Sequence, residues 1–163
     1  MPARLLRRLQ EFLDANRIHY DVLDHHEAYT APEVAHTLHV PGKMLAKVVI
    51  VNADGKLLMA VLPSNWQVDL ARLQEVLGAR HVRLASEAEF QGLFPDCETG
   101  TMPPFGNLYG LNVYVDQCLT EDEEIVVPAG FHSRALKLRY EDFARAVQPK
   151  VAEFHRAPAE SAY

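Results

Sequence analysis

Two apolar runs separated by a turn signal constrain the fold of this chain most strongly. Residues 45–51 and 57–62 are each of strand length and almost wholly apolar, and Ala53-Asp54-Gly55-Lys56 lies between them. An Asp-Gly pair in this position is typical of a β-hairpin, because glycine readily adopts the positive φ that tight hairpin turns require. The sequence therefore predicts a hairpin of two buried strands.

Further strands and helices interleave with this hairpin along the chain. Leu6, Leu9 and Leu13 follow helical spacing, and Tyr20 and Val22 alternate with polar residues as in a half-buried strand. Capping and stop signals predict helices over residues 30–38, 69–77, 86–94 and 141–147, and apolar runs predict strands at 81–84, 112–115, 125–127 and 135–138. We expect a single α/β domain over residues 1–150, with a mixed, largely antiparallel central sheet flanked by helices, and a frayed tail over residues 151–163.

Composition and charge narrow the classes of function. The chain has 163 residues, is 48% hydrophobic and carries a formal net charge of −6, so a broad basic surface for the nucleic-acid backbone is not expected. We therefore predict no DNA binding, although a few local cations could hold the end of an RNA. No apolar stretch approaches the roughly 20 residues that span a bilayer. We predict no membrane association and, with two cysteines and no visible export signal, a cytoplasmic location.

Lys47 is the only cation in the first apolar run. An unpartnered ammonium is costly to bury, so two interpretations are open. The lysine lies near a strand end or sheet edge and extends to water, or it points into a pocket and holds a phosphate, carboxylate or sugar oxygen.

Residues 95–109 form the most irregular stretch, and within it residues 100–106, hereafter the 100–106 loop, have the pattern Gly100-x-x-x-Pro104. Glycine lets backbone amides approach a ligand closely, and oriented N–H groups can bind an anion or stabilise an oxyanion. The alternative is a rigid structural turn with Phe105 packed in the core.

Histidines and cysteines give weaker signals. His132, in Gly130-Phe-His-Ser133, could donate a hydrogen bond or transfer a proton, or lie in an ordinary surface turn. His25-His26 and the pair His36 and His39 lack completing ligands, so we predict no metal and no cofactor. Cys97 has no neighbouring feature that would activate it as a nucleophile.

In their order along the chain, the strand lysine, the Gly-x-x-x-Pro loop and the late Gly-x-His turn resemble the YbaK/EbsC and prolyl-tRNA-synthetase-associated family of editing domains. Asn52-Ala-Asp-Gly55 and Asn112-Val-Tyr-Val-Asp116 add support, and the resemblance extends to about Pro149. It implies a free-standing trans-editing hydrolase that deacylates mischarged aminoacyl-tRNA carrying a small amino acid, without a metal. The implied partners are the 3′ end of aminoacyl-tRNA and an aminoacyl-tRNA synthetase.

The resemblance also implies roles for particular residues. Lys47, Gly100 and Pro104 would be catalytic, with Lys47 positioning the 3′-terminal nucleotide and the loop backbone surrounding the aminoacyl carbonyl. The implied substrate-binding residues are Met102, Phe105, Gly106, Gly130 and His132. Glu98 and Met102 depart from the usual family pattern and leave the amino-acid specificity open. The alternatives are a non-catalytic aminoacyl- or nucleotide-binding or synthetase-docking module, and a histidine-based metallohydrolase.

Overall fold

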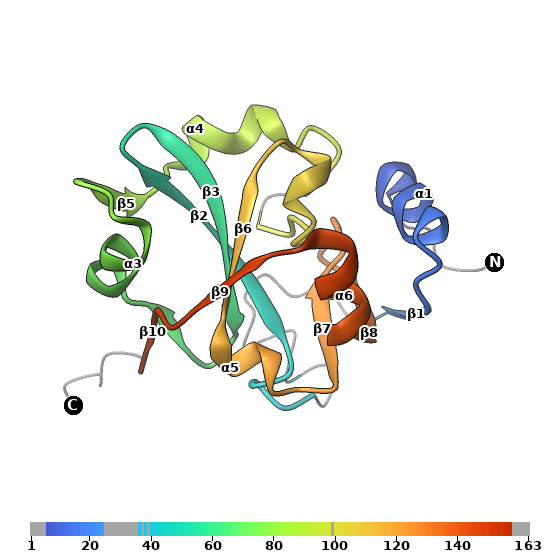
Figure 1. The fold of residues 1–163 in the computed structure, drawn as a ribbon. Helices are drawn as coiled ribbons and strands as arrows, with labels where there is room; N and C mark the ends of the chain where they lie inside the picture. The colour runs from blue at the N-terminus through green and yellow to red at the C-terminus, as the bar shows by residue number, and fades with distance from the viewer. Residues whose placement is uncertain (1–5, 25–35, 37, 39, 99, 158–163) are drawn as a thin grey trace.

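Two main β-sheets and a short ribbon form the framework of the protein (Figure 1). The computed structural model describes residues 6–24, 36, 38, 40–98 and 100–157. One sheet has the strand order β5-β2-β3-β6-β9, the second has the order β1-β8-β7, and β10 pairs with β4. The five-stranded sheet is mixed, because β6 is parallel to both β3 and β9 whereas the remaining pairs in both main sheets are antiparallel. The predicted mixed α/β architecture is confirmed.

The predicted hairpin is the centre of the larger sheet. Strands β2 (Ala46–Ala53) and β3 (Lys56–Pro63) pair in antiparallel register from Ala46↔Pro63 to Ala53↔Lys56. Asp54 and Gly55 form the two-residue turn with φ values of 50° and 87°. The Asn52 side chain accepts the Gly55 N–H at 2.8 Å, which fixes the turn locally.

Most other predicted elements are present, most of them with shifts of a residue or two at their ends, and the helix predicted over residues 86–94 ends at Phe90 and continues as a 3₁₀ turn to Leu93. The strands are β1 (Tyr20–Asp24), β5 (Val82–Leu84), β6 (Asn112–Asp116), β7 (Glu124–Pro128) and β8 (Arg134–Arg139). The helices are α1 (Arg7–Ala15), α3 (Leu70–Leu77), α4 (Glu87–Phe90) and α6 (Tyr140–Val147), and short 3₁₀ turns follow at η1 (Gln91–Leu93) and η2 (Gly106–Leu108). The capping box predicted at Thr30 lies outside the described residues.

Local capping explains where the helices begin and end. The Asp69 side chain accepts the Arg72 N–H at 3.1 Å at the start of α3, and Gly78 ends that helix in the left-handed conformation. At α4, the Glu89 carboxylate accepts the Ser86 N–H at 2.8 Å, as the sequence pattern predicts.

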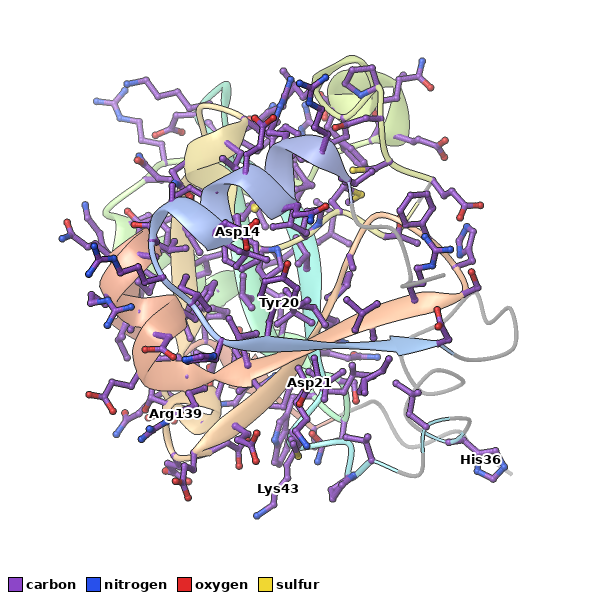
Figure 2. The ribbon with its side chains drawn as sticks, turned by 90° about the vertical axis from the view of Figure 1, so that its right-hand side faces the viewer. Asp14, Tyr20, Asp21, His36, Lys43 and Arg139 are labelled. Carbon is purple, nitrogen blue, oxygen red and sulfur yellow. The ribbon has the colours of Figure 1, made fainter. Side chains whose placement is uncertain are left out.

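The main core lies between the two sheets and beneath α1 and α6. Phe105 is fully buried there, with edge-to-face contacts to Phe12 on α1 and Phe143 on α6. On β1, Tyr20 lies on the side facing α1, where its hydroxyl donates to Asp14 at 3.5 Å, and Asp21 lies on the other side (Figure 2). A second core, which includes Leu62, Leu73 and Phe154, packs on the opposite face of the five-stranded sheet.

The expectation of a frayed tail from residue 151 is wrong for the described residues. Strand β9 (Lys150–Ala152) extends the large sheet in parallel with β6, and β10 (His155–Arg156) pairs with β4 (Gln67–Val68). Phe154, between these strands, is fully buried. Burial of one large aromatic side chain and two strand pairings hold the segment in place. None of the helices in the described part of the chain is both long and apolar enough to cross a membrane.

Candidate functional site

The 100–106 loop and the turn around Gly130 are joined by backbone hydrogen bonds. The Glu98 N–H donates to the Gly130 carbonyl at 3.0 Å, and the Gly130 N–H donates to the Thr101 carbonyl at 2.8 Å. The Glu98 carboxylate accepts the His132 N–H at 2.9 Å. Two of the three segments that the sequence singled out are therefore parts of one junction, although about thirty residues separate them in the chain.

Glycine is required in this junction for two different reasons. Gly100 has φ +82° and open space around it, so backbone conformation is its constraint. Gly130 has φ +92° and also lies against α1, where an added Cβ would be 2.5 Å from Leu6 Cδ1. The tip of the β7–β8 connection is thus fixed against both the loop and the N-terminal helix.

The buried half of the loop is packed into the core. Met102 is 5% exposed and Phe105 is fully buried. An added Cβ on Gly106 would be 2.6 Å from both the Leu111 carbonyl oxygen and Val113 Cγ2. Phe105 is therefore a core residue, as the alternative interpretation of the loop predicted. Its side chain has no exposed surface that a ligand could contact. Pro104 is also buried, so the exposed part of the loop is around Gly100.

Lys47 lies on the strand that borders this junction. Strand β2 touches β7 through a parallel bridge between Leu45 and Val126, and the Val126 N–H donates to the Met44 carbonyl at 3.0 Å. Because the two strands run in the same direction from this bridge, Lys47 and the segment leading to Gly130 follow on the same side of it. Lys47 lies two residues beyond this bridge and Gly130 lies four residues beyond it, and the described residues show no hydrogen bond between Lys47 and the turn.

The side chain of Lys47 points away from the main core. Its neighbour Ala46 belongs to the main core, whereas its cross-strand partner Leu62 belongs to the second core. The side chain is half-buried, and this burial lowers the pKa of the Lys47 ammonium. Within the described residues it has neither an ion pair nor a hydrogen-bonding partner. An anionic or oxygen-bearing ligand would offset the cost of this burial.

Thr101 is a site residue that sequence reasoning missed. It is 7% exposed, its N–H and hydroxyl both donate to the Glu98 carbonyl, at 3.1 and 2.7 Å, and its own carbonyl holds Gly130. Only its position inside the loop could have indicated this role.

Cys97, next to the loop, has the character of a structural thiol. Its sulfur lies 3.6 Å from the Tyr109 hydroxyl, and burial raises the pKa of the thiol to about 11. The predicted absence of an activated nucleophile therefore agrees with its surroundings.

Solved structures share this fold across nearly the whole chain. A crystal structure of hypothetical protein APE2540 superposes with a TM-score of 0.83 over 92% of this chain and 100% of that chain, at 21% identity. A crystal structure of a candidate trans-editing enzyme for prolyl tRNA synthetase gives a TM-score of 0.78 over 93% of this chain and 96% of that chain, at 19% identity. The fold is thus one that known α/β domains adopt.

The sequence places the chain within a family. The model of the aminoacyl-tRNA editing domain matches residues 25–146, and the chain belongs to this family. A multifunctional Ser/Thr-tRNA deacylase, ProXp-y of Escherichia coli K12, is 32% identical over 106 residues, covering 64% of this chain and 63% of that protein. The proline–tRNA ligase of Lactococcus lactis subsp. lactis is 31% identical over 108 residues, or 64% of this chain and 17% of the ligase. The matched segment spans less than two thirds of the length of either relative.

Proposed function

We propose that this protein is a trans-editing hydrolase that deacylates mischarged aminoacyl-tRNA carrying a small amino acid. The observations that support the proposal are the hydrogen-bonded junction of Glu98, Thr101, Gly130 and His132 and the half-buried ammonium of Lys47. Membership of the editing-domain family and the E. coli deacylase relative support it.

The exposed part of the junction offers a donor for a developing oxyanion. In the part of the chain that the structure describes, the backbone N–H group of the exposed Gly100 donates no hydrogen bond. Ester hydrolysis converts the carbonyl oxygen into an oxyanion, and N–H groups fixed in advance stabilise that charge without reorganisation. We assign this role to the loop around Gly100, with the Thr101–Gly130 hydrogen bond holding the loop in place.

Lys47 would act on the tRNA end rather than on the ester bond. A point charge on a flexible stem suits phosphate or ribose oxygens at the 3′-terminal nucleotide. With that nucleotide held, the ester would be aligned for attack by a water molecule. The reaction then requires no covalent intermediate, in agreement with the raised pKa of the Cys97 thiol. None of these steps requires a metal ion.

The misattached amino acid on the tRNA is expected to be small, because small amino acids are the ones that synthetases confuse. Synthetase pockets discriminate poorly between amino acids that differ by one methylene or hydroxyl, so a second hydrolytic site removes the errors. The candidates are alanine, cysteine, serine and threonine, the last two from the printed specificity of the E. coli relative. Because a relative of this chain is a proline–tRNA ligase, a synthetase is also a proposed partner.

The test is deacylation of a panel of tRNAs charged with these four amino acids, with correctly charged Pro-tRNA as the control. We expect turnover of at least one mischarged species and slow or no turnover of the control. Binding of the charged tRNAs without turnover of any would instead favour a non-catalytic binding module.

A further inference from the structure

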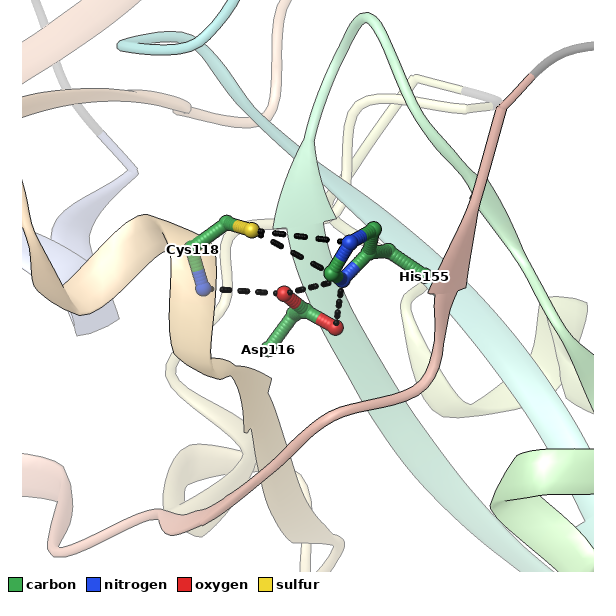
Figure 3. Close-up of side chains that lie close together, drawn as sticks. All are labelled: Asp116, Cys118 and His155. Carbon is green, nitrogen blue, oxygen red and sulfur yellow. Dashed lines mark hydrogen bonds and ion pairs between the residues drawn. The ribbon is translucent and has the colours of Figure 1, made fainter.

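Three side chains that can bind a metal converge at the end of β6. Asp116 ends β6, Cys118 lies in the short helix α5 (Gln117–Thr120), and His155 begins β10 (Figure 3). His155 Nδ1 lies 3.0 and 3.1 Å from the two Asp116 carboxylate oxygens. The Cys118 sulfur lies 3.6 Å from Nδ1 and 3.7 Å from Nε2 of the same ring.

The surrounding protein fixes the orientation of these groups. The Asp116 carboxylate is fully buried and accepts the N–H groups of Cys118 at 2.9 Å and Phe154 at 2.8 Å. The His155 side chain is 19% exposed and packs against Trp66, with 4.8 Å between the ring centroids. Hydrogen bonds and packing around the ligands are the support that metal sites use to orient their first shell.

We propose that Asp116, Cys118 and His155 form a binding site for a divalent transition-metal ion of the zinc class. Their thiolate, imidazole and carboxylate donors are the ones that zinc prefers, and three protein ligands leave a fourth tetrahedral position for water. With bonds of about 2.3 Å to sulfur and about 2.0 Å to nitrogen, a tetrahedral ion holds these two atoms about 3.5 Å apart. The sulfur–nitrogen distances of 3.6 and 3.7 Å are close to this value.

The local charge also favours a cation. Glu121 acts electrostatically on the Cys118 thiol in addition to Asp116, whereas Glu153 is paired with Arg72 at 2.6 Å. The excess of negative charge attracts a divalent ion, and the ion then replaces the thiol proton as the thiolate binds it.

A cysteine–histidine–aspartate hydrolytic triad is the competing assignment, and the geometry argues against it. The sulfur is almost equidistant from the two ring nitrogens, and the carboxylate approaches one of them, Nδ1. A triad needs the thiol aligned with one nitrogen and the carboxylate with the other.

A metal at this position would tie the C-terminal segment to the large sheet. The ligands on β6 and α5 are 39 and 37 residues from His155 in sequence, and the fully buried Phe154 is the neighbour of that histidine. Metal binding to the folded state alone would stabilise the fold. Bound metal would therefore add to the stability of the folded chain.

The experiment is titration of the metal-free protein with Co²⁺, which replaces zinc and gives a charge-transfer absorption band when it binds a thiolate. Cys97→Ser is the matched control, because Cys97 and Cys118 are the two cysteines of the chain. We expect one ion per chain at micromolar Co²⁺, with the band present in wild type and in Cys97→Ser. The band should be absent in Cys118→Ser, and affinity should fall about tenfold or more in His155→Gln. Fluorescence of Trp66, the single tryptophan, should be quenched in parallel.

The proposal is overturned if wild type gives no band below millimolar Co²⁺, or if the band is lost in Cys97→Ser and kept in Cys118→Ser. Zn²⁺ should raise the melting temperature of wild type and of Cys97→Ser, and leave that of Cys118→Ser unchanged. If Cys118→Ser does not fold, alkylation of wild type decides the question. Zn²⁺ should then protect Cys118 from the reagent, and absence of protection would exclude the site.

Discussion

Gly106→Ala tests whether the buried half of the 100–106 loop is a packing element. An alanine Cβ at this position would lie 2.6 Å from the Leu111 carbonyl oxygen, 2.6 Å from Val113 Cγ2 and 3.3 Å from Met59 Sδ. The Leu111 oxygen is backbone, and the Leu111 N–H donates to the Gly106 carbonyl at 2.9 Å, so this neighbour cannot move independently. Overpacking of a core costs about 1–3 kcal/mol, and two contacts this short put the expected loss near about 3 kcal/mol.

Urea unfolding measures this loss directly, and a melting temperature lower by about 6–12 °C should accompany it for a domain of this size. Gly92→Ala is the matched control, because an added Cβ there meets nothing within 4 Å. That control should stay within about 0.5 kcal/mol of wild type. An unchanged unfolding midpoint in Gly106→Ala would refute the packing argument, and loss of deacylation without loss of stability would instead place Gly106 in the substrate site.

Three further predictions concern the surroundings of the site and the acid stability of the fold. Glu98→Ala removes the acceptor of the His132 N–H, so amide exchange at His132 should become faster than in wild type, and equal rates would contradict the link. Glu89, whose pKa is lowered to about 2 by its hydrogen bonds to Arg83, contributes stability that is present above its ordinary value of 4.5 and is lost as the pH falls through about 2. Glu89→Gln should therefore lose less stability than wild type as the pH falls from 5 to about 2, which unfolding midpoints measured over this range would show. Cys97 should be alkylated slowly at neutral pH and faster toward pH 11, and Cys97→Ser should retain deacylation.

Local signals predicted most of the fold because they act over a few residues. The Asp54-Gly55 turn and the Asp69 cap are each set by short-range hydrogen bonds, so the sequence alone indicates them. Strands β9 and β10 have three and two residues and gain their stability from distant partners. Val151 is 51% exposed and gives no alternating pattern, whereas the burial of Phe154 depends on a core assembled elsewhere.

In the candidate site, too, local features could be predicted from the sequence and contacts between distant segments could not. The residue types at Lys47, Gly100 and His132 could be identified from the sequence, and the junction through Glu98 and Thr101 could not, because it joins backbone groups of distant segments. Phe105 and Gly106 stand in a glycine- and proline-rich loop, yet their surroundings are those of the core.

The three potential metal ligands at Asp116 were likewise not indicated by the sequence. Asp116 and Cys118 are two residues apart and close to His155 in space, but 37 residues separate Cys118 from His155 in the chain. The histidines that the sequence suggested as possible metal ligands were instead two pairs nearer the N-terminus.

Single-turnover deacylation by wild type, Lys47→Ala and the control Lys56→Ala tests the central claim most directly. Lys56 is an exposed lysine at the start of β3, on the same hairpin as Lys47. If Lys47 orients the tRNA end, its removal should slow hydrolysis of the preferred mischarged tRNA about 100-fold in a folded protein, and Lys56→Ala should retain the wild-type rate. A folded Lys47→Ala protein with the wild-type rate would contradict the account.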